Sequence, residues 1–130
     1  RIGLNRMILW GALVCLLALV LALVIDLLGM LVPLAFFGAI AVMGFGNGMV
    51  LPNANAGLMG VRPELAGTAS GLGGALAVGG GAALSALAGA LLQPGSGAGP
   101  LLVIMCASAL GSLLAILWVL RRERQLGLAA

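Results

Sequence analysis

The apolar residues of this chain form long runs that short polar or glycine- and proline-containing segments interrupt. The first run extends from Met7 to Met59 with few breaks. As one helix it would be roughly 80 Å long at about 1.5 Å per residue, whereas the hydrocarbon core of a bilayer is about 30 Å thick. The run must therefore fold back once. Asp26, Gly29 and Pro33 mark the reversal, because aspartate is unfavourable inside a membrane and proline can begin a helix.

Two further apolar segments follow this pair. A polar turn with Arg62, Pro63 and Glu64 precedes a third segment rich in Gly, Ala and Ser, and an uncharged loop leads to a fourth. The pattern predicts an all-α membrane protein with four transmembrane helices, at 7–28, 32–59, 65–92 and 101–120. The predicted connections are a cytoplasmic loop at 1–6, an external turn at 29–31, a cytoplasmic turn at 60–64, an external loop at 93–100 and a cytoplasmic tail at 121–130.

The arginines lie at the ends of the apolar segments, and this placement predicts the topology. Arg1 and Arg6 precede the first segment, Arg62 lies between the second and third, and the cluster 121–124 follows the fourth. Four crossings bring these sites to one side of the membrane. Because cytoplasmic loops are enriched in Lys and Arg, we expect both ends of the chain in the cytoplasm.

Composition agrees with a bilayer environment and argues against enzyme chemistry. The chain is 63% hydrophobic and 7% charged, whereas soluble domains carry about 25% charged residues. It has no histidine and three well separated acidic residues. We therefore expect no catalytic residue, metal site or cofactor, and we do not expect an enzyme. The net charge of +3 comes from dispersed arginines, which argues against a nucleic-acid partner.

Polar side chains inside the second and third predicted helices are candidate functional groups. Asn47, Asn53 and Asn55 should face the protein interior or a wet cavity, because an amide facing lipid is unfavourable. Interhelical hydrogen bonding and a substrate path both remain open for them. Pro52 is expected to kink its helix, since proline removes a backbone donor. Cys15, in a long apolar run, is interpreted as a packing residue.

Glycine pairs four residues apart indicate where helices could approach closely. Gly44 with Gly48 and Gly67 with Gly71 fit the small-xxx-small pattern. We interpret them as packing positions inside one bundle, with homodimerisation through the same faces as the alternative.

Two stretches carry a more specific pattern, Leu51-Pro52-Asn53-Ala54-Asn55-Ala56 and Ala66-Gly67-Thr68-Ala69-Ser70-Gly71-Leu72-Gly73-Gly74. They resemble the last third of a major facilitator superfamily transporter, and more narrowly its bicyclomycin-resistance/CflA drug-efflux branch. There a Pro-Asn-Ala segment ends one helix and an Ala-Gly-x-Ala-Ser-x-Leu-x-Gly run begins the next. The chain departs from this pattern at Gly71 and Gly73. The segment at 1–6 resembles the basic loop before the ninth helix, with Leu4 and Asn5 in place of basic or proline residues.

The resemblance implies that the chain supplies helices nine to twelve of a twelve-helix transporter in a bacterial inner membrane. Because the chain begins with Arg1, we expect it to be the tail of a longer protein. Such proteins export drugs or small metabolites against a proton gradient by alternating access, with coupling residues chiefly in the first half. The helix at 32–59 would line the substrate cavity, and the first and last helices would be peripheral. Arg1, Arg6 and Arg62 would pair with acidic residues of the remaining N-terminal helices.

Two other hypotheses remain open at this point. One is a complete four-helix drug exporter that works as a dimer, although Asp26 lies far from mid-membrane, where such exporters need a carboxylate. The other is a membrane scaffold or assembly subunit whose glycine-rich faces bind partner helices.

Overall fold

The structure is a computed structural model that describes residues 3–60, 62–93, 95 and 97–126. It contains four long helices and one short 3-10 helix, and no strand within these residues: α1 Leu4–Leu27, α2 Pro33–Gly60, η1 Pro63–Leu65, α3 Ala66–Leu91 and α4 Gly99–Gln125. Each of the four long helices is long and apolar enough to cross a membrane. The predicted fold class, an all-α membrane protein with four spans, is confirmed at this level.

The turn between α1 and α2 lies where the sequence predicts it, and Gly29 explains its geometry. Gly29 has φ of 68°, in the left-handed region that favours glycine. Its N–H donates to the carbonyl of Asp26 at 2.9 Å, and the N–H of Met30 donates to the carbonyl of Ile25 at 3.1 Å. This pair of bonds is a Schellman cap, which satisfies the last carbonyls of α1.

Helix α4 extends beyond its predicted end at residue 120 and includes the charged cluster up to Gln125. Arg and Glu are good helix formers, and the basic residues Arg122 and Arg124 lie in the last turn, where the helix dipole favours positive charge. Residues 121–125 of the predicted tail are therefore helical, and their cytoplasmic location stays a prediction. The hydrophobic pattern located the end of the apolar segment, whereas the helix itself continues.

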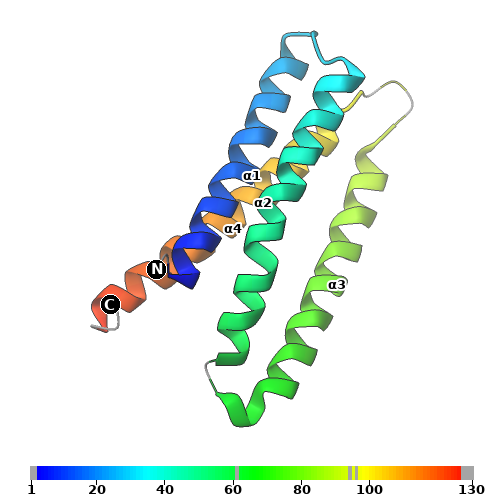
Figure 1. The fold of residues 1–130 in the computed structure, drawn as a ribbon. Helices are drawn as coiled ribbons and strands as arrows, with labels where there is room; N and C mark the ends of the chain where they lie inside the picture. The colour runs from blue at the N-terminus through cyan, green and yellow to red at the C-terminus, as the bar shows by residue number, and fades with distance from the viewer. Residues whose placement is uncertain (1–2, 61, 94, 96, 127–130) are drawn as a thin grey trace.

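Helix α1 lies against α2 along most of its length and also packs on α4, whereas α3 makes much sparser contacts with α2 and α4 (Figure 1). Four of the buried hydrophobic side chains belong to α1: Ala12, Cys15, Leu19 and Ala22. Within the described chain α1 is thus the most enclosed helix. This differs from the peripheral position that the resemblance implies for the first helix.

The closest approach of two helices is at Gly11 of α1 and Gly46 of α2. A Cβ added to Gly46 would lie 2.8 Å from the carbonyl oxygen of Gly11 and 2.5 Å from Cys15 Sγ. A Cβ added to Gly11 would lie 2.7 Å from the carbonyl oxygen of Gly46. Only glycine allows this contact, as expected for small-residue packing of membrane helices.

The four glycines that the sequence analysis selected lie elsewhere. No atom of the described structure lies within 4 Å of a Cβ built on any of them: Gly44, Gly48, Gly67 and Gly71. Packing at these positions inside the four-helix arrangement is therefore not observed. Close packing of helices at glycines was expected, but its location at Gly11 and Gly46 could not be predicted from the sequence. The point where two helices cross depends on their relative rotation. Homodimerisation through these faces stays a prediction.

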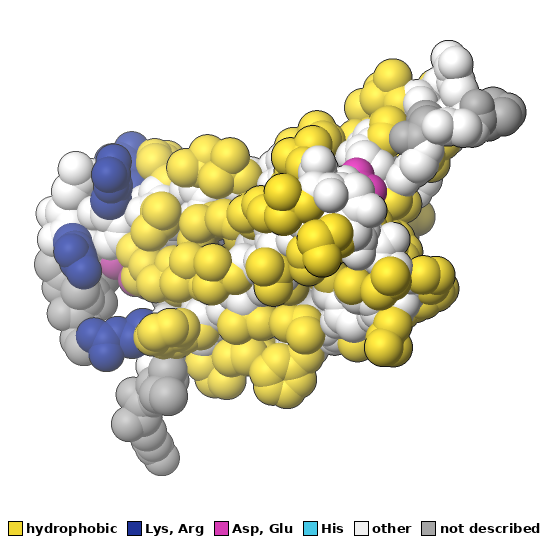
Figure 2. Space-filling view, turned by 90° about the horizontal axis from the view of Figure 1, so that it is seen from above, with side chains coloured by type: hydrophobic (Ala, Val, Ile, Leu, Met, Phe, Trp, Pro, Cys, Tyr) yellow, Lys and Arg dark blue, Asp and Glu magenta, His cyan; other side chains and the backbone are white. Residues whose placement is uncertain are grey.

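The surface of the molecule is largely apolar, with many exposed leucines, and Figure 2 shows hydrophobic side chains over most of the visible face. Arginine side chains gather at one end in the same view. The antiparallel course of the helices explains this. Arg6 begins α1, Arg62 lies in the turn after α2, and three arginines occupy the end of α4. Arg1 lies outside the described residues.

Two side-chain contacts involve the charged end of α4. Asn5 of α1 donates from Nδ2 to Glu123 Oε1 of α4, which joins the beginning of the first helix to the end of the last. The guanidinium of Arg122 lies 5.7 Å from the ring centroid of Trp118, within cation–π range. Trp118 is exposed near this end, as expected for an aromatic side chain at a membrane–water interface.

Candidate ligand cavity

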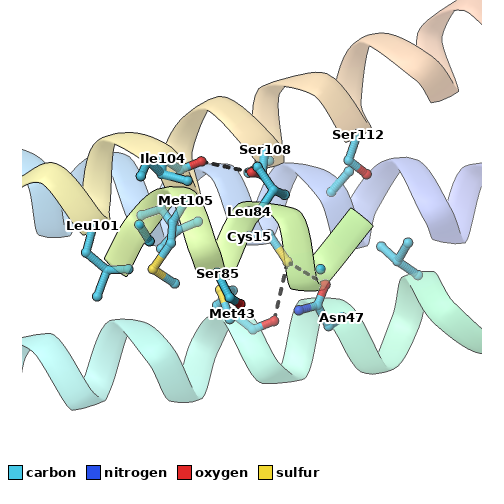
Figure 3. Close-up of a pocket in the computed structure, with 16 residues that line it drawn as sticks. Cys15, Met43, Asn47, Leu84, Ser85, Leu101, Ile104, Met105, Ser108 and Ser112 are labelled. Carbon is cyan, nitrogen blue, oxygen red and sulfur yellow. Dashed lines mark hydrogen bonds between the residues drawn. The ribbon is translucent and has the colours of Figure 1, made fainter. Parts of the chain in front are cut away.

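A cavity of about 500 Å³ lies among the four long helices, and each helix contributes side chains to its wall (Figure 3). Most of the wall is apolar. Its polar groups are one thiol, one amide and three hydroxyls: Cys15, Asn47, Ser85, Ser108 and Ser112. No described residue in the wall carries a charge. The amide and the hydroxyls belong to exposed residues, so the cavity is open rather than sealed.

The α1–α2 contact places Cys15 and Asn47 together at the cavity. Cys15 is buried beside Gly46, and its Sγ lies 3.3 Å from the carbonyl oxygen of Met43 and 3.8 Å from Asn47 Oδ1. The thiol therefore donates towards two oxygens of α2. Figure 3 shows the amide oxygen of Asn47 on the side of Cys15. No hydrogen bond joins Asn47 Nδ2 to another described residue, so this amide nitrogen remains an available donor.

The serines approach the cavity from α3 and α4. Ser108 and Ser112 are four residues apart and therefore share one face of α4. Ser108 Oγ donates to the carbonyl of Ile104 at 2.9 Å, which leaves its oxygen lone pairs as acceptors. No such bond to the described chain occupies the hydroxyl of Ser85 or Ser112. The wall thus offers both donors and acceptors on an apolar background.

Of the three predicted cavity residues, the structure places only Asn47 in the wall. Asn53 is half-buried, and its Nδ2 donates to the carbonyl of Met49 one turn earlier, at 2.6 Å. Asn55 is exposed and lies outside the lining. Asn53, six residues after Asn47, is about 240° further round the helix and so lies on another face of α2. Asn55, eight residues after Asn47, lies about 12 Å further along the helix axis, beyond the wall.

Pro52 lies inside α2, which continues as a helix on both sides of it. Because proline has no backbone N–H, the carbonyl of Gly48 loses its usual partner four residues later. The side chain of Asn53 supplies an additional donor to the neighbouring carbonyl of Met49. The predicted kink at Pro52 stays a prediction.

Ser108 and Ser112 of α4 are not among the residues predicted from the sequence, because the resemblance implies a peripheral position for this helix. The available signal was their spacing: two hydroxyls four residues apart define a polar stripe on an apolar helix. Cys15 was interpreted as a packing residue. Its burial agrees with that role, but its hydrogen bonding to Asn47 could not be inferred without the helix register.

A second cavity of about 490 Å³ lies between α1 and α2 and has a wall of apolar residues and one glycine, including Val14, Leu21, Ala35 and Val42. It has no polar side chain that could orient a ligand. Asp26 lies in neither cavity wall. It belongs to the last turn of α1, and its carboxylate lies beside the start of α4, where a Cβ added to Gly99 would be 3.1 Å from Asp26 Oδ2.

No protein-family model, curated protein or solved structure matches this chain. Its class therefore follows from the fold and the cavity. It is a multi-pass α-helical membrane protein with an uncharged, partly polar cavity among its helices.

Proposed function

We propose that this chain is the C-terminal part of a proton-coupled efflux transporter that exports drugs or small metabolites by alternating access. The single observation that carries the proposal is the cavity to which all four membrane-crossing helices contribute. Its volume lies within the range of about 300–1,000 Å³ that is typical of small-molecule sites. Its wall, apolar with a few polar groups, is also typical of such sites.

The depth of the polar groups supports a transport pathway. Cys15, Asn47 and Ser112 each lie near the middle of a helix that is long enough to cross the bilayer. Polar groups at mid-membrane are unfavourable against lipid and usually face a bundle interior or a substrate path. Transporters of the major facilitator type bind substrate near the bilayer midplane between their helical repeats. The chain would supply helices nine to twelve of such a protein.

The arginine distribution supports an orientation with both ends in the cytoplasm of a bacterial inner membrane. The described arginines share one end of the bundle, and the positive-inside rule assigns that end to the cytoplasm. The N-terminal helices of the same protein would cover the exposed faces and carry the proton-coupling carboxylate. Arg6 and Arg62, both exposed, are then available to pair with acidic residues on those helices.

The test is efflux by the whole gene product in cells that lack their own drug pumps. Asn47→Leu removes the cavity amide, and Asn55→Leu is the matched control because Asn55 lies on the same helix outside the wall. We expect Asn47→Leu to lose substrate efflux and Asn55→Leu to retain it. When a protonophore collapses the gradient, the wild-type protein and Asn55→Leu should lose efflux as well. Equal retention in both variants, or efflux indifferent to the protonophore, would count against the proposal.

One observation favours a scaffold as the second candidate function. The glycines of α3 at 67, 71 and 74 have no neighbour within 4 Å of an added Cβ, so this helix presents a smooth face to its surroundings. Small-residue faces of this kind bind other transmembrane helices. A dimeric small multidrug exporter is less well supported, because Asp26 lies in the last turn of α1, beside the start of α4, and not in the cavity.

A further inference from the structure

We infer that the cavity binds an uncharged, largely apolar molecule that carries a hydrogen-bond acceptor such as a carbonyl oxygen. The inference concerns which ligand the cavity selects. It deepens the proposed function by naming a substrate class, and it rests on that function only for transport, not for binding.

The absence of charge in the described wall argues against ionic ligands. An ion that leaves water for an apolar cavity loses its hydration and needs an opposite charge in compensation. The acidic side chains that could supply one are engaged or distant. Asp26, in the last turn of α1, lies beside the beginning of α4. Glu123, near the end of α4, accepts a hydrogen bond from Asn5, and Glu64 is exposed in η1. A cationic ligand in the cavity would therefore have no partner among the described residues.

The hydrogen bonds already made in the wall indicate which ligand group is favoured. The oxygen of the Asn47 amide faces the Cys15 thiol, which leaves the NH₂ group as the free half of that side chain. The hydroxyls of Ser85 and Ser112 add two further donors. Because these donors have no partner in the described chain, a ligand acceptor between α2 and α4 would satisfy them. A ligand without such an acceptor would leave them unpaired.

The cavity also contains two residues that report occupancy. Met43 of α2 and Met105 of α4 line the wall, whereas Met30 and Met59 lie outside it and are exposed on the surface. Photoexcited benzophenone abstracts hydrogen from nearby C–H groups, methionine included, and the two radicals then combine to form a covalent adduct. Benzophenone is also uncharged, largely apolar and has one carbonyl oxygen, so it serves as both ligand and probe.

The experiment compares benzophenone with its (trimethylammonio)methyl derivative on the whole gene product in lipid nanodiscs. Peptide mass spectrometry locates the adducts. We expect benzophenone to label Met43 and Met105 in a saturable way, and the cationic derivative to label them weakly. Asn47→Leu should lower the labelling affinity at these positions roughly fivefold, as for one lost hydrogen bond. Asn55→Leu should leave it unchanged. Asn47→Asp should raise labelling by the cationic probe.

The outcomes separate this inference from the proposed function. Labelling confined to Met30 and Met59 would show partition into lipid and would overturn the inference. Equal or stronger cavity labelling by the cationic probe would also overturn it. If Asn47→Leu does not fold, Ser112→Ala provides a milder loss of one donor with the same expected direction. Saturable cavity labelling without efflux would uphold the inference and contradict transport. Efflux of cations without benzophenone labelling would support transport and contradict the inference about the ligand.

Discussion

At the scale of single residues, the contact between Gly11 and Gly46 determines how closely α1 and α2 pack. The nearest obstacle to a larger side chain at Gly46 includes a backbone carbonyl, which cannot rotate away as a side chain can. The same contact positions Cys15 next to Asn47 and thereby orients the cavity amide. A change at this glycine should therefore affect both helix packing and the cavity.

Gly46→Ala should destabilise the protein by about 1–3 kcal/mol, the usual effect of overpacking a close contact. Gly44→Ala is the matched control, since it lies on the same helix with open space around it and alanine is the better helix former. The measurement is denaturant unfolding of both variants in mild detergent. Equal stability of the two variants would show that the α1–α2 contact is looser than described.

Asn47 itself could be selected from the sequence because amides are rare and unfavourable in apolar spans. Its separation from Asn53 and Asn55 could not be predicted. All three share a helix within nine residues, and both the rotation of α2 and the extent of the cavity along its axis decide which of them line the wall. Ser108 and Ser112 were missed for a different reason. Serine is common in membrane helices as a small packing residue, so its hydroxyl alone gives little indication of a cavity.

At the scale of elements, the hydrophobic pattern predicted the helices well and their charged ends poorly. The turn at 28–32 could be located because aspartate, glycine and proline each disfavour a continuing apolar helix. The end of α4 could not, because residues 121–125 leave the apolar pattern while keeping a high helix propensity. Hydropathy indicates which part of a helix lies in the membrane, whereas the residue where the helix ends depends on the helix propensity of its residues.

The cap of α1 gives a prediction at this scale. Gly29→Ala places a side chain at φ of 68° and should destabilise the α1–α2 hairpin by about 1 kcal/mol. Gly38→Ala, in the body of α2 with nothing within 4 Å of its added Cβ, should be neutral or slightly stabilising. Unfolding midpoints in detergent compare them. A neutral Gly29→Ala would mean that the turn adopts another conformation.

The extension of α4 gives a second prediction for an element. Glu123→Ala removes the acceptor for Asn5 and should reduce stability by about 1 kcal/mol. Glu64→Ala is the control, because Glu64 is exposed in η1. Spin labels on the first turn of α1 and the last turn of α4 would show a wider distance distribution for Glu123→Ala only. An unchanged distribution would show that apolar packing alone holds these ends together.

At the scale of the whole molecule, the four long helices differ in how extensively they pack against one another. α1 and α2 form the best-packed pair, α4 joins them, and α3 makes the fewest contacts for its length (Figure 1). Ala88 is the only buried hydrophobic side chain of α3 among the described residues. The high content of Gly, Ala and Ser in α3 is visible in the sequence, but how sparsely this helix packs on its neighbours depends on the tertiary arrangement and could not be predicted.

Amide hydrogen exchange should show the difference in packing between α3 and α1. Amides of α3 should exchange faster than those of α1 when this chain is studied alone in detergent, because sparsely packed elements open at lower free energy. In the whole gene product the proposed N-terminal helices would cover α3 and slow its exchange, whereas α1 would change little. Equal protection of α1 and α3 in the isolated chain would contradict the packing described for α3.

The contact between Asp26 and the start of α4 has a consequence for the way the chain enters the membrane. These positions are separated by two complete long helices, so their contact cannot form until the start of α4 has left the ribosome. The α1–α2 hairpin, with its short capped turn, is by contrast complete before α3 is synthesised. Within these four helices the α1–α2 hairpin would therefore form first, and α4 would dock onto the exposed side of α1 only after α3 has been made.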